Sequence, residues 1–165
     1  MDIPQTVWLL LLLAAAAGLV SGVFLTFSDF VMKSLAATRP SAGTEAMQII
    51  NREVFRSIFM VLLMGMIPVS ILTAIMGYFF YDGILSALLV VAGLLYFAGV
   101  FLTSAFGNIP MNNTLEALPL GGVEAQRYWP DYVRGWVQWN HVRWLAALGV
   151  SACYMVSAVL MANPT

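Results

Sequence analysis

Four long stretches of this chain carry no charged residue, and they restrict its fold more than any other feature. The stretches run over residues 3–28, 57–81, 83–115 and 144–165. About 20 apolar residues in a helix cross the roughly 30 Å hydrocarbon core of a bilayer, and each stretch exceeds that length. The pattern therefore predicts an all-α fold with four transmembrane helices.

The composition agrees with this interpretation, since 61% of the residues are hydrophobic and only 9% are charged, far from the usual mix of a soluble domain. A chain of 165 residues then has no room for a second, soluble domain, so we expect one transmembrane domain over residues 1–165. The net charge of −1 provides no basic field for nucleic acid. The first stretch lacks a basic leading segment and is too long for a signal peptide, so we expect it to be retained as the first helix.

The basic residues predict the topology, because they all fall in the first and third connections between the spans. These residues are Lys33, Arg39, Arg52, Arg56, Arg127, Arg134 and Arg143. Basic residues favour the cytoplasmic side of a membrane, which predicts an up-down four-helix bundle with both termini outside (N-out/C-out). We expect spans at about residues 7–35, 56–80, 84–106 and 136–161, in a bacterial inner (cytoplasmic) membrane.

Local sequence signals predict where these helices begin and end. Pro40 and Gly43 interrupt the first helix. Thr44 begins an amphipathic helix that continues into the second span as far as Phe80. The third helix is expected to stop at residues 107–110, which read Gly-Asn-Ile-Pro. The fourth is expected to begin near Pro130.

Polar and aromatic residues gather at the expected cytoplasmic end of this otherwise apolar chain. One face of the fourth helix carries Tyr132, Trp136, Asn140, Arg143 and Ala147. A polar pair such as Asn140 and Arg143 is costly in a bilayer unless it meets partners inside the bundle. The expected partners from the other helices are Asp29, Asn51 or Glu53, and Asn108 or Asn112. All four helices thus deliver polar groups to one place, as a small-molecule site requires.

Each of these residues also has a simpler structural interpretation. Trp and Tyr commonly anchor helices at the membrane interface. Arg143 can extend to lipid headgroups or pair with Asp29, and Asp29 can instead form an ordinary i,i+4 pair with a lysine. Asn108 can cap the third helix, and His141, about 100° around the helix from Asn140, can face headgroups. The joint pattern is more informative than any single residue.

The sequence also narrows the chemistry. One His and one Cys cannot build a His-rich copper or zinc site within a single chain. There is no Gly-rich dinucleotide motif, no nucleophile elbow and no CxxC motif, and the carboxylates show no spacing typical of iron ligands. We expect no metal site and no resident cofactor, so an enzyme of this kind would use cofactor-independent chemistry or a borrowed cofactor.

Two runs of residues carry a resemblance to a known family. They are Asn108-Ile-Pro-Met-Asn112 and Trp139-Asn-His-Val-Arg143. Together with the run at residues 46–51 and the aromatic residues at positions 129, 132 and 136, they resemble the anthrone-oxygenase-like family of small four-helix integral membrane proteins. The resemblance spans about residues 18–148 and departs at Lys33, where the family pattern leads us to expect Pro.

The resemblance implies an activity, which in the named fungal members is oxidation of an anthrone, a lipophilic tricyclic polyketide, to an anthraquinone with O₂. The family's residue pattern matches this chain by position at Asn51, Asn108, Asn112, Trp136, Asn140 and Arg143. The match alone assigns none of them a catalytic role.

In the enzyme hypothesis, the protein removes a proton from a flat lipophilic substrate, an anthrone or quinol, whose carbanion then reacts with O₂. Asp29 or His141 would be the base, and Arg143 with the Asn amides would stabilise the enolate. Trp136 and Trp139 would stack on the rings. The substrate-binding candidates are Asn51, Asn108, Asn112, Trp136, Trp139 and Asn140.

The alternative hypothesis is non-enzymatic. A small four-span protein with short loops is also typical of an accessory or assembly subunit of a larger membrane protein complex, in which the polar cluster would only lock the bundle. Expected partners are therefore membrane lipid, a lipophilic small molecule or quinone, or a larger complex. Transport has little support, because the chain shows no inverted repeat.

Overall fold

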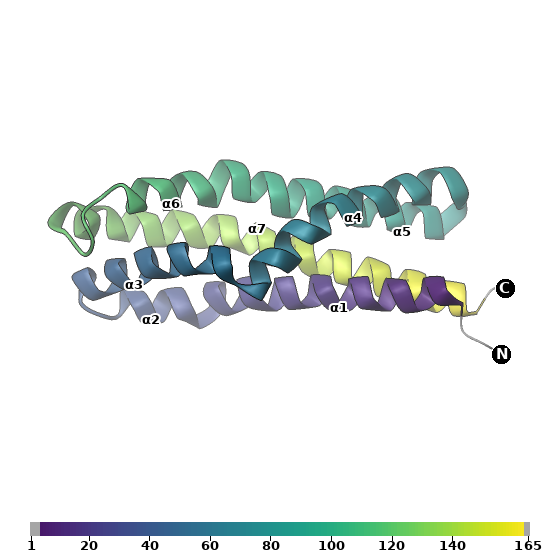
Figure 1. The fold of residues 1–165 in the computed structure, drawn as a ribbon, viewed down its shortest axis with the longest axis horizontal. Coiled ribbons are helices and arrows are strands. Elements are labelled where there is room, and N and C mark those ends of the chain that lie inside the picture. Colours follow the sequence, from purple (N-terminus) through teal and green to yellow (C-terminus); the bar gives the residue numbers. More distant parts are fainter. Residues whose placement is uncertain (1–3, 164–165) are drawn as a thin grey trace.

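Four long antiparallel helices form the computed structural model, which describes residues 4–163 (Figure 1). They cover Gln5–Ala36, Ile58–Phe80, Gly83–Glu116 and Val123–Ala162, and each is long and apolar enough to cross a membrane. The chain runs up and down, so the start of the first helix and the end of the last lie at the same end of the bundle (Figure 1). The predicted all-α four-helix bundle is confirmed.

The first and third long helices are built from shorter elements, whereas the second and fourth are single α-helices. The first comprises α1 (Gln5–Thr26), a π-helical turn (Phe27–Val31) and α2 (Met32–Ala36). After it come α3 (Pro40–Glu53), a 3₁₀ turn (Val54–Arg56) and α4 (Ile58–Phe80). The third comprises α5 (Gly83–Leu94), π-helical segments at Leu95–Leu102 and Ser104–Asn108, and α6 (Ile109–Glu116). The last is α7 (Val123–Ala162).

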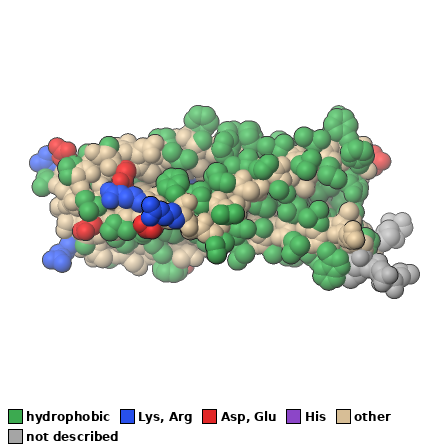
Figure 2. All heavy atoms as spheres, in the orientation of Figure 1, with side chains coloured by type: hydrophobic (Ala, Val, Ile, Leu, Met, Phe, Trp, Pro, Cys, Tyr) green, Lys and Arg blue, Asp and Glu red, His purple; other side chains and the backbone are tan. Residues whose placement is uncertain are grey.

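The surface separates into an apolar part and a charged end. Hydrophobic side chains cover most of the face visible in Figure 2, whereas charged side chains gather at the end of the bundle that contains α3 and α6. Large apolar side chains such as Leu12, Leu72 and Phe79 are more than half exposed, as expected for helices that face lipid. The four apolar helices and this surface indicate an integral membrane protein.

The prediction of one continuous helix from Thr44 to Phe80 is wrong. The helix begins earlier, at Pro40, and is interrupted at Ser57, whose backbone is extended with φ −93° and ψ 155°. The Ser57 hydroxyl accepts a hydrogen bond from the backbone N–H of Met60 at 3.2 Å, so it caps a new helix, α4. The 3₁₀ turn before it contacts only α3 and α4, which lets the two helices meet at an angle.

Two further helix ends differ from the prediction. The third helix does not stop at residues 107–110, because the π-helical segment Ser104–Asn108 continues without a break into α6, whose first turn contains Pro110. The fourth begins at Val123 and passes through Pro130. Trp129 and Tyr132 are buried beside that proline, so tertiary packing holds the helix together where one backbone hydrogen bond is lost.

Buried side chains form two clusters along the bundle. The larger joins α1, α4, α5 and α7 in the apolar part and includes Val20, Phe24, Tyr96 and Val150. The smaller lies at the charged end and consists of Met32, Met47, Leu115, Ala125, Trp129, Tyr132 and Trp136. The second cluster fixes α3 and α6 against α7.

Gln48 holds α3 against α6 and the following connection by hydrogen bonds. Its side chain is fully buried and its Nε2 donates to the backbone carbonyls of Leu115 and Leu118, at 2.9 and 3.0 Å. Its Oε1 accepts from the N–H of Gly121 at 3.1 Å. One α3 side chain therefore holds the end of α6 and the connection to α7.

We expect Gly93→Ala to destabilise the bundle by about 1–3 kcal/mol, the usual cost of overpacking. A Cβ at Gly93 would lie 2.5 Å from the Cβ of Ala74 and 2.7 Å from the carbonyl oxygen of Ser70, so α4 and α5 would have to separate. At Gly65 a Cβ would meet no atom within 4 Å, so Gly65→Ala is expected to keep or raise stability through better helix propensity. Thermal unfolding in detergent measures both, and equal melting temperatures would contradict the close approach of α4 and α5.

Candidate functional site

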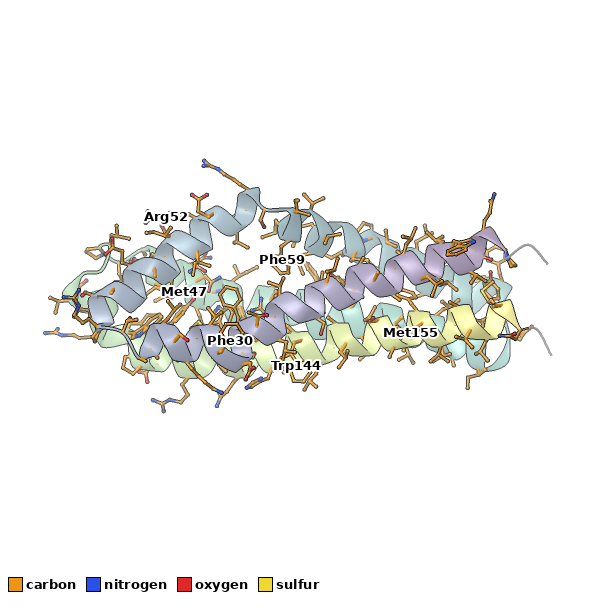
Figure 3. All side chains as sticks on the ribbon, turned by 90° about the horizontal axis from the view of Figure 1, so that it is seen from below. Phe30, Met47, Arg52, Phe59, Trp144 and Met155 are labelled. Carbon is orange, nitrogen blue, oxygen red and sulfur yellow. The ribbon has the colours of Figure 1, made fainter. Side chains whose placement is uncertain are left out.

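A cavity of about 590 Å³ lies under the junction between α3 and α4. Figure 3 shows these two helices bowed away from α1 at the break, with Met47 and Phe59 on the inner side of the bow. Most of the lining is apolar or aromatic, and it includes Phe24, Phe27, Phe59, Met60, Leu63 and Val100. The interruption at Ser57, which separates α3 from α4, therefore shapes a space suited to a lipophilic molecule.

Both α4 and α6 contribute exposed residues to the cavity lining. Met64 of α4 and Ile109 of α6 both line it, and they are 45% and 46% exposed. These two helices do not contact each other.

Arg143 supplies the charge inside the cavity and is itself only 6% exposed. Its Nη2 donates to Asn140 Oδ1 at 2.7 Å and its Nη1 to Ser104 Oγ at 3.5 Å. The guanidinium carbon lies 4.2 Å from the ring centre of Phe24 and 5.0 Å from that of Trp136, which are cation–π distances.

No carboxylate pairs with Arg143 in the part of the chain that the structure describes. Its Nε is buried and has no hydrogen-bond partner among the same residues. A buried cation with only neutral partners is costly, because the low dielectric weakens its solvation. The arrangement therefore favours a bound anion, or an oxygen atom that gains negative charge during a reaction.

Asn140 holds Arg143 in place and joins α7 to α1. It is fully buried, and its Nδ2 donates to the backbone carbonyl of Phe24 and to Ser28 Oγ, both at 2.6 Å. Ser28 lies in the π-helical turn of the first helix, and such turns are frequent at functional sites. The amide thus orients the guanidinium by bonding to a neighbouring helix.

Asn112 fixes the aromatic wall of the cavity. Its Oδ1 accepts from the Tyr132 hydroxyl at 2.8 Å and from Trp136 Nε1 at 2.9 Å. Trp136 also packs against Phe27, with ring centres 5.7 Å apart. These contacts hold the Trp136 ring beside Arg143, where it covers one side of the guanidinium.

Two other asparagines have polar atoms without partners. Asn51 lines the cavity, and its buried Nδ2 has no hydrogen-bond partner among residues 4–163. Asn108 is fully buried and donates from Nδ2 to the carbonyl of Trp136 at 3.0 Å, but it does not line the cavity. Asn51 therefore contributes an amide to the cavity wall, whereas Asn108 supports α7.

Five sequence-predicted site residues do not line the cavity: Asn108 and Asn140 are fully buried, whereas Asp29, His141 and Trp139 are exposed. Asp29 is exposed and faces Lys33 at 4.0 Å instead of Arg143. His141 is exposed, and its Nδ1 accepts a hydrogen bond from Trp144 Nε1 at 3.1 Å. Trp139 is 45% exposed and does not line the cavity. The structure thus brings together Arg143 with Asn51, Asn112, Trp136 and Asn140, and it keeps the two predicted bases away from them.

A stripe on the third helix was missed from the sequence. Ser104, Asn108, Asn112 and Glu116 follow one another at intervals of four residues, the spacing of one helix face. Three of them, Ser104, Asn112 and Glu116, line the cavity. The signal was present in the sequence, but the predicted helix end at residues 107–110 divided it.

The family model for anthrone oxygenase matches residues 55–153. The match covers more than half of the chain and includes α4, α5, α6 and most of α7. No curated protein and no solved structure matches the chain.

Proposed function

Because the chain belongs to the anthrone oxygenase family, we propose that its cavity binds a flat, lipophilic anthrone-like or quinol-like molecule and promotes its oxidation by O₂. The observation that carries the proposal is the buried guanidinium of Arg143, which has no carboxylate partner in the described chain and lies at an apolar cavity. An enolate or phenolate oxygen would supply the missing negative charge.

The size and lining of the cavity support a flat aromatic ligand. Its volume of about 590 Å³ lies within the range of roughly 300–1,000 Å³ that is usual for small-molecule sites. Phe24, Phe27, Phe59 and Trp136 line it, and aromatic rings favour stacked or edge-on contacts with other rings. Exposed lining residues on α4 and α6, two helices that do not contact each other, would admit a substrate that partitions into the membrane.

In the proposed reaction the substrate undergoes the bond changes, and the protein stabilises the anion that forms. An anthrone loses a proton from its ring methylene, and the electron pair moves onto the carbonyl oxygen to form an enolate. The enolate carbon reacts with O₂; one oxygen atom becomes the new carbonyl and the other leaves as water, so anthrone plus O₂ gives anthraquinone plus water. The Arg143 guanidinium and the Asn51 amide, which both line the cavity, would donate hydrogen bonds to the enolate oxygen.

The predicted orientation of the helices also suggests on which side of the membrane the cavity lies. If the basic residues face the cytoplasm, the cavity opens in the cytoplasmic half of a bacterial inner membrane. Substrate would then enter from the inner leaflet, and the charged end of the bundle would remain in water.

The test is anthrone-dependent O₂ uptake by the purified protein in lipid nanodiscs, with anthraquinone formation followed by absorbance. Empty nanodiscs provide the spontaneous rate, which must be subtracted because anthrones oxidise slowly in air. The proposal expects a protein-dependent rate with one O₂ consumed per anthraquinone formed. A rate equal to that of empty nanodiscs, over a series of anthrones and quinols, would refute it.

Asp29→Asn and His141→Ala are expected to leave this rate within about twofold of the wild type. Both side chains lie outside the cavity and are exposed, and general acid–base catalysis requires the base within hydrogen-bond reach of the proton. The same O₂-uptake assay measures both variants. A large loss in either one would show that the reacting molecule lies outside the cavity described above.

A further inference from the structure

An ion pair lies at the rim of the cavity. Arg52 of α3 donates from Nε to Glu116 Oε1 of α6, and both residues line the cavity. Their side chains are 51% and 37% exposed, whereas Arg143 is buried. The cavity therefore has a charged, partly exposed rim and a cationic interior.

The Glu116 carboxylate has one oxygen free for another partner. Oε1 is occupied by Arg52, but Oε2 is buried and has no hydrogen-bond partner within residues 4–163. Asn112, one turn earlier on the same face of α6, also lines the cavity. Oε2 thus belongs to a residue of the cavity wall, although the atom itself has less than 1 Å² of accessible surface.

Glu116 is the only carboxylate among the described residues that line the cavity, and no His lines it. Tyr96 already donates its hydroxyl to the carbonyl of Leu63 at 2.9 Å, and the remaining ionisable lining groups are the cations Arg52 and Arg143. The exposed Asp29 and His141 do not reach this space. A carbon acid bound in the cavity therefore meets one anionic proton acceptor.

We infer that Glu116 accepts the proton from the substrate methylene, with Arg52 as the residue that positions its carboxylate; this inference rests on the proposed function. The Glu116 carboxylate forms the new O–H bond as the substrate C–H bond breaks, and the electron pair stays on the substrate as the enolate. Arg143 stabilises the enolate oxygen from the buried side. Because Glu116 is partly exposed at the rim, the proton then passes to water and the carboxylate is restored.

The test separates proton removal from oxidation. Under anaerobic conditions in D₂O, anthrone is incubated with protein in nanodiscs and deuterium incorporation at the ring methylene is measured by mass spectrometry. Glu116→Gln is expected to lower the protein-dependent exchange rate by about 100-fold or more, the usual contribution of a general base. Binding of anthraquinone, which has no acidic methylene, should be unchanged. Glu53→Gln is the matched control, because Glu53 is an exposed neighbour of Arg52 that does not line the cavity.

Arg52 is tested by a pair of variants. Arg52→Gln is expected to slow exchange by about tenfold, since the carboxylate loses its orientation, and Arg52→Lys should restore most of that loss by supplying another cation. Anthraquinone affinity should not change in either variant. Equal exchange rates in the Gln and Lys variants would argue against positioning through charge.

The outcomes distinguish the assignment of Glu116 as the base from the proposed oxidation of an anthrone. If the wild type accelerates exchange but Glu116→Gln does so equally well, the assignment of Glu116 is wrong and the proposed function stands. If the wild type does not exceed empty nanodiscs in either exchange or O₂ uptake, the proposed function fails and the assignment fails with it. Glu116→Asp provides a second variant in case Gln disturbs folding, with an exchange rate expected between those of the wild type and Glu116→Gln.

Discussion

Replacing Arg143 by Gln is expected to lower the rate of anthrone oxidation by about 100- to 1,000-fold, the usual effect of removing one oxyanion-stabilising donor. Gln retains a hydrogen-bonding amide but removes the charge from the buried side of the cavity. The melting temperature should stay the same or rise, because the folded state no longer buries a cation that lacks a carboxylate partner in the described chain. Activity and stability would therefore change in different directions, which identifies a functional rather than a structural charge.

Arg143→Lys is the informative companion variant. Lys retains the charge but loses the planar set of donors, so activity is expected to lie between those of the wild type and Arg143→Gln. O₂ uptake and thermal unfolding are measured on the same nanodisc samples. An Arg143→Gln protein that oxidises anthrone at the wild-type rate, or that unfolds at a much lower temperature, would contradict the role given to this guanidinium.

Asn140→Leu is expected to destabilise the protein by about 2–3 kcal/mol and also to reduce its activity. The side chain makes three buried hydrogen bonds, to Phe24, Ser28 and Arg143, and each interhelical bond in a membrane protein contributes roughly 0.6–2 kcal/mol. Removing the amide deletes two of the hydrogen bonds between the first helix and α7 and leaves Arg143 without its shortest hydrogen bond. Unfolding measured by thermal scanning should show the loss.

A double-mutant cycle checks whether Asn140 acts partly through Arg143. The cost of Asn140→Leu should be smaller in an Arg143→Met protein, by a coupling energy of about 0.5–3 kcal/mol. His141→Ala controls for a substitution at the next position of the same helix, since His141 is exposed and should leave stability unchanged. Strictly additive effects would mean that the Asn140–Arg143 bond contributes little.

The helices and one face of the site follow from local sequence patterns. Charge-free runs long enough to cross a bilayer predict four helices because the signal depends on segment length alone. The face of α7 that carries Trp136, Asn140 and Arg143 follows from helical periodicity, and all three residues are buried in the structure. Local patterns were therefore sufficient to predict a span or a buried face wherever it lies on one uninterrupted helix.

The cavity itself depends on non-local geometry. Ser57 fits either a helix interior or a helix cap, so the sequence does not show that α3 and α4 separate there and leave space between them. In the sequence Pro110 is typical of a helix end, although in the structure it lies in the first turn of α6. The predicted end divided the stripe that contains Ser104 and Glu116, so the stripe was not recognised as one helix face. Asp29 lies in a π-helical turn, whose additional residue shifts the helix face, so a purely α-helical projection misplaces it.

Photochemical labelling with anthraquinone tests most directly whether the cavity is the site of binding. Excited anthraquinone abstracts hydrogen from nearby C–H bonds and forms covalent adducts, which peptide mass spectrometry locates. The account predicts adducts in the cavity-lining segments at residues 23–27 and 59–64, suppressed by excess anthrone without O₂ and reduced in Arg143→Gln. Adducts spread over outward-facing residues such as Leu12 and Phe79, unaffected by anthrone, would show that the molecule dissolves in the surrounding lipid and that the cavity does not bind it.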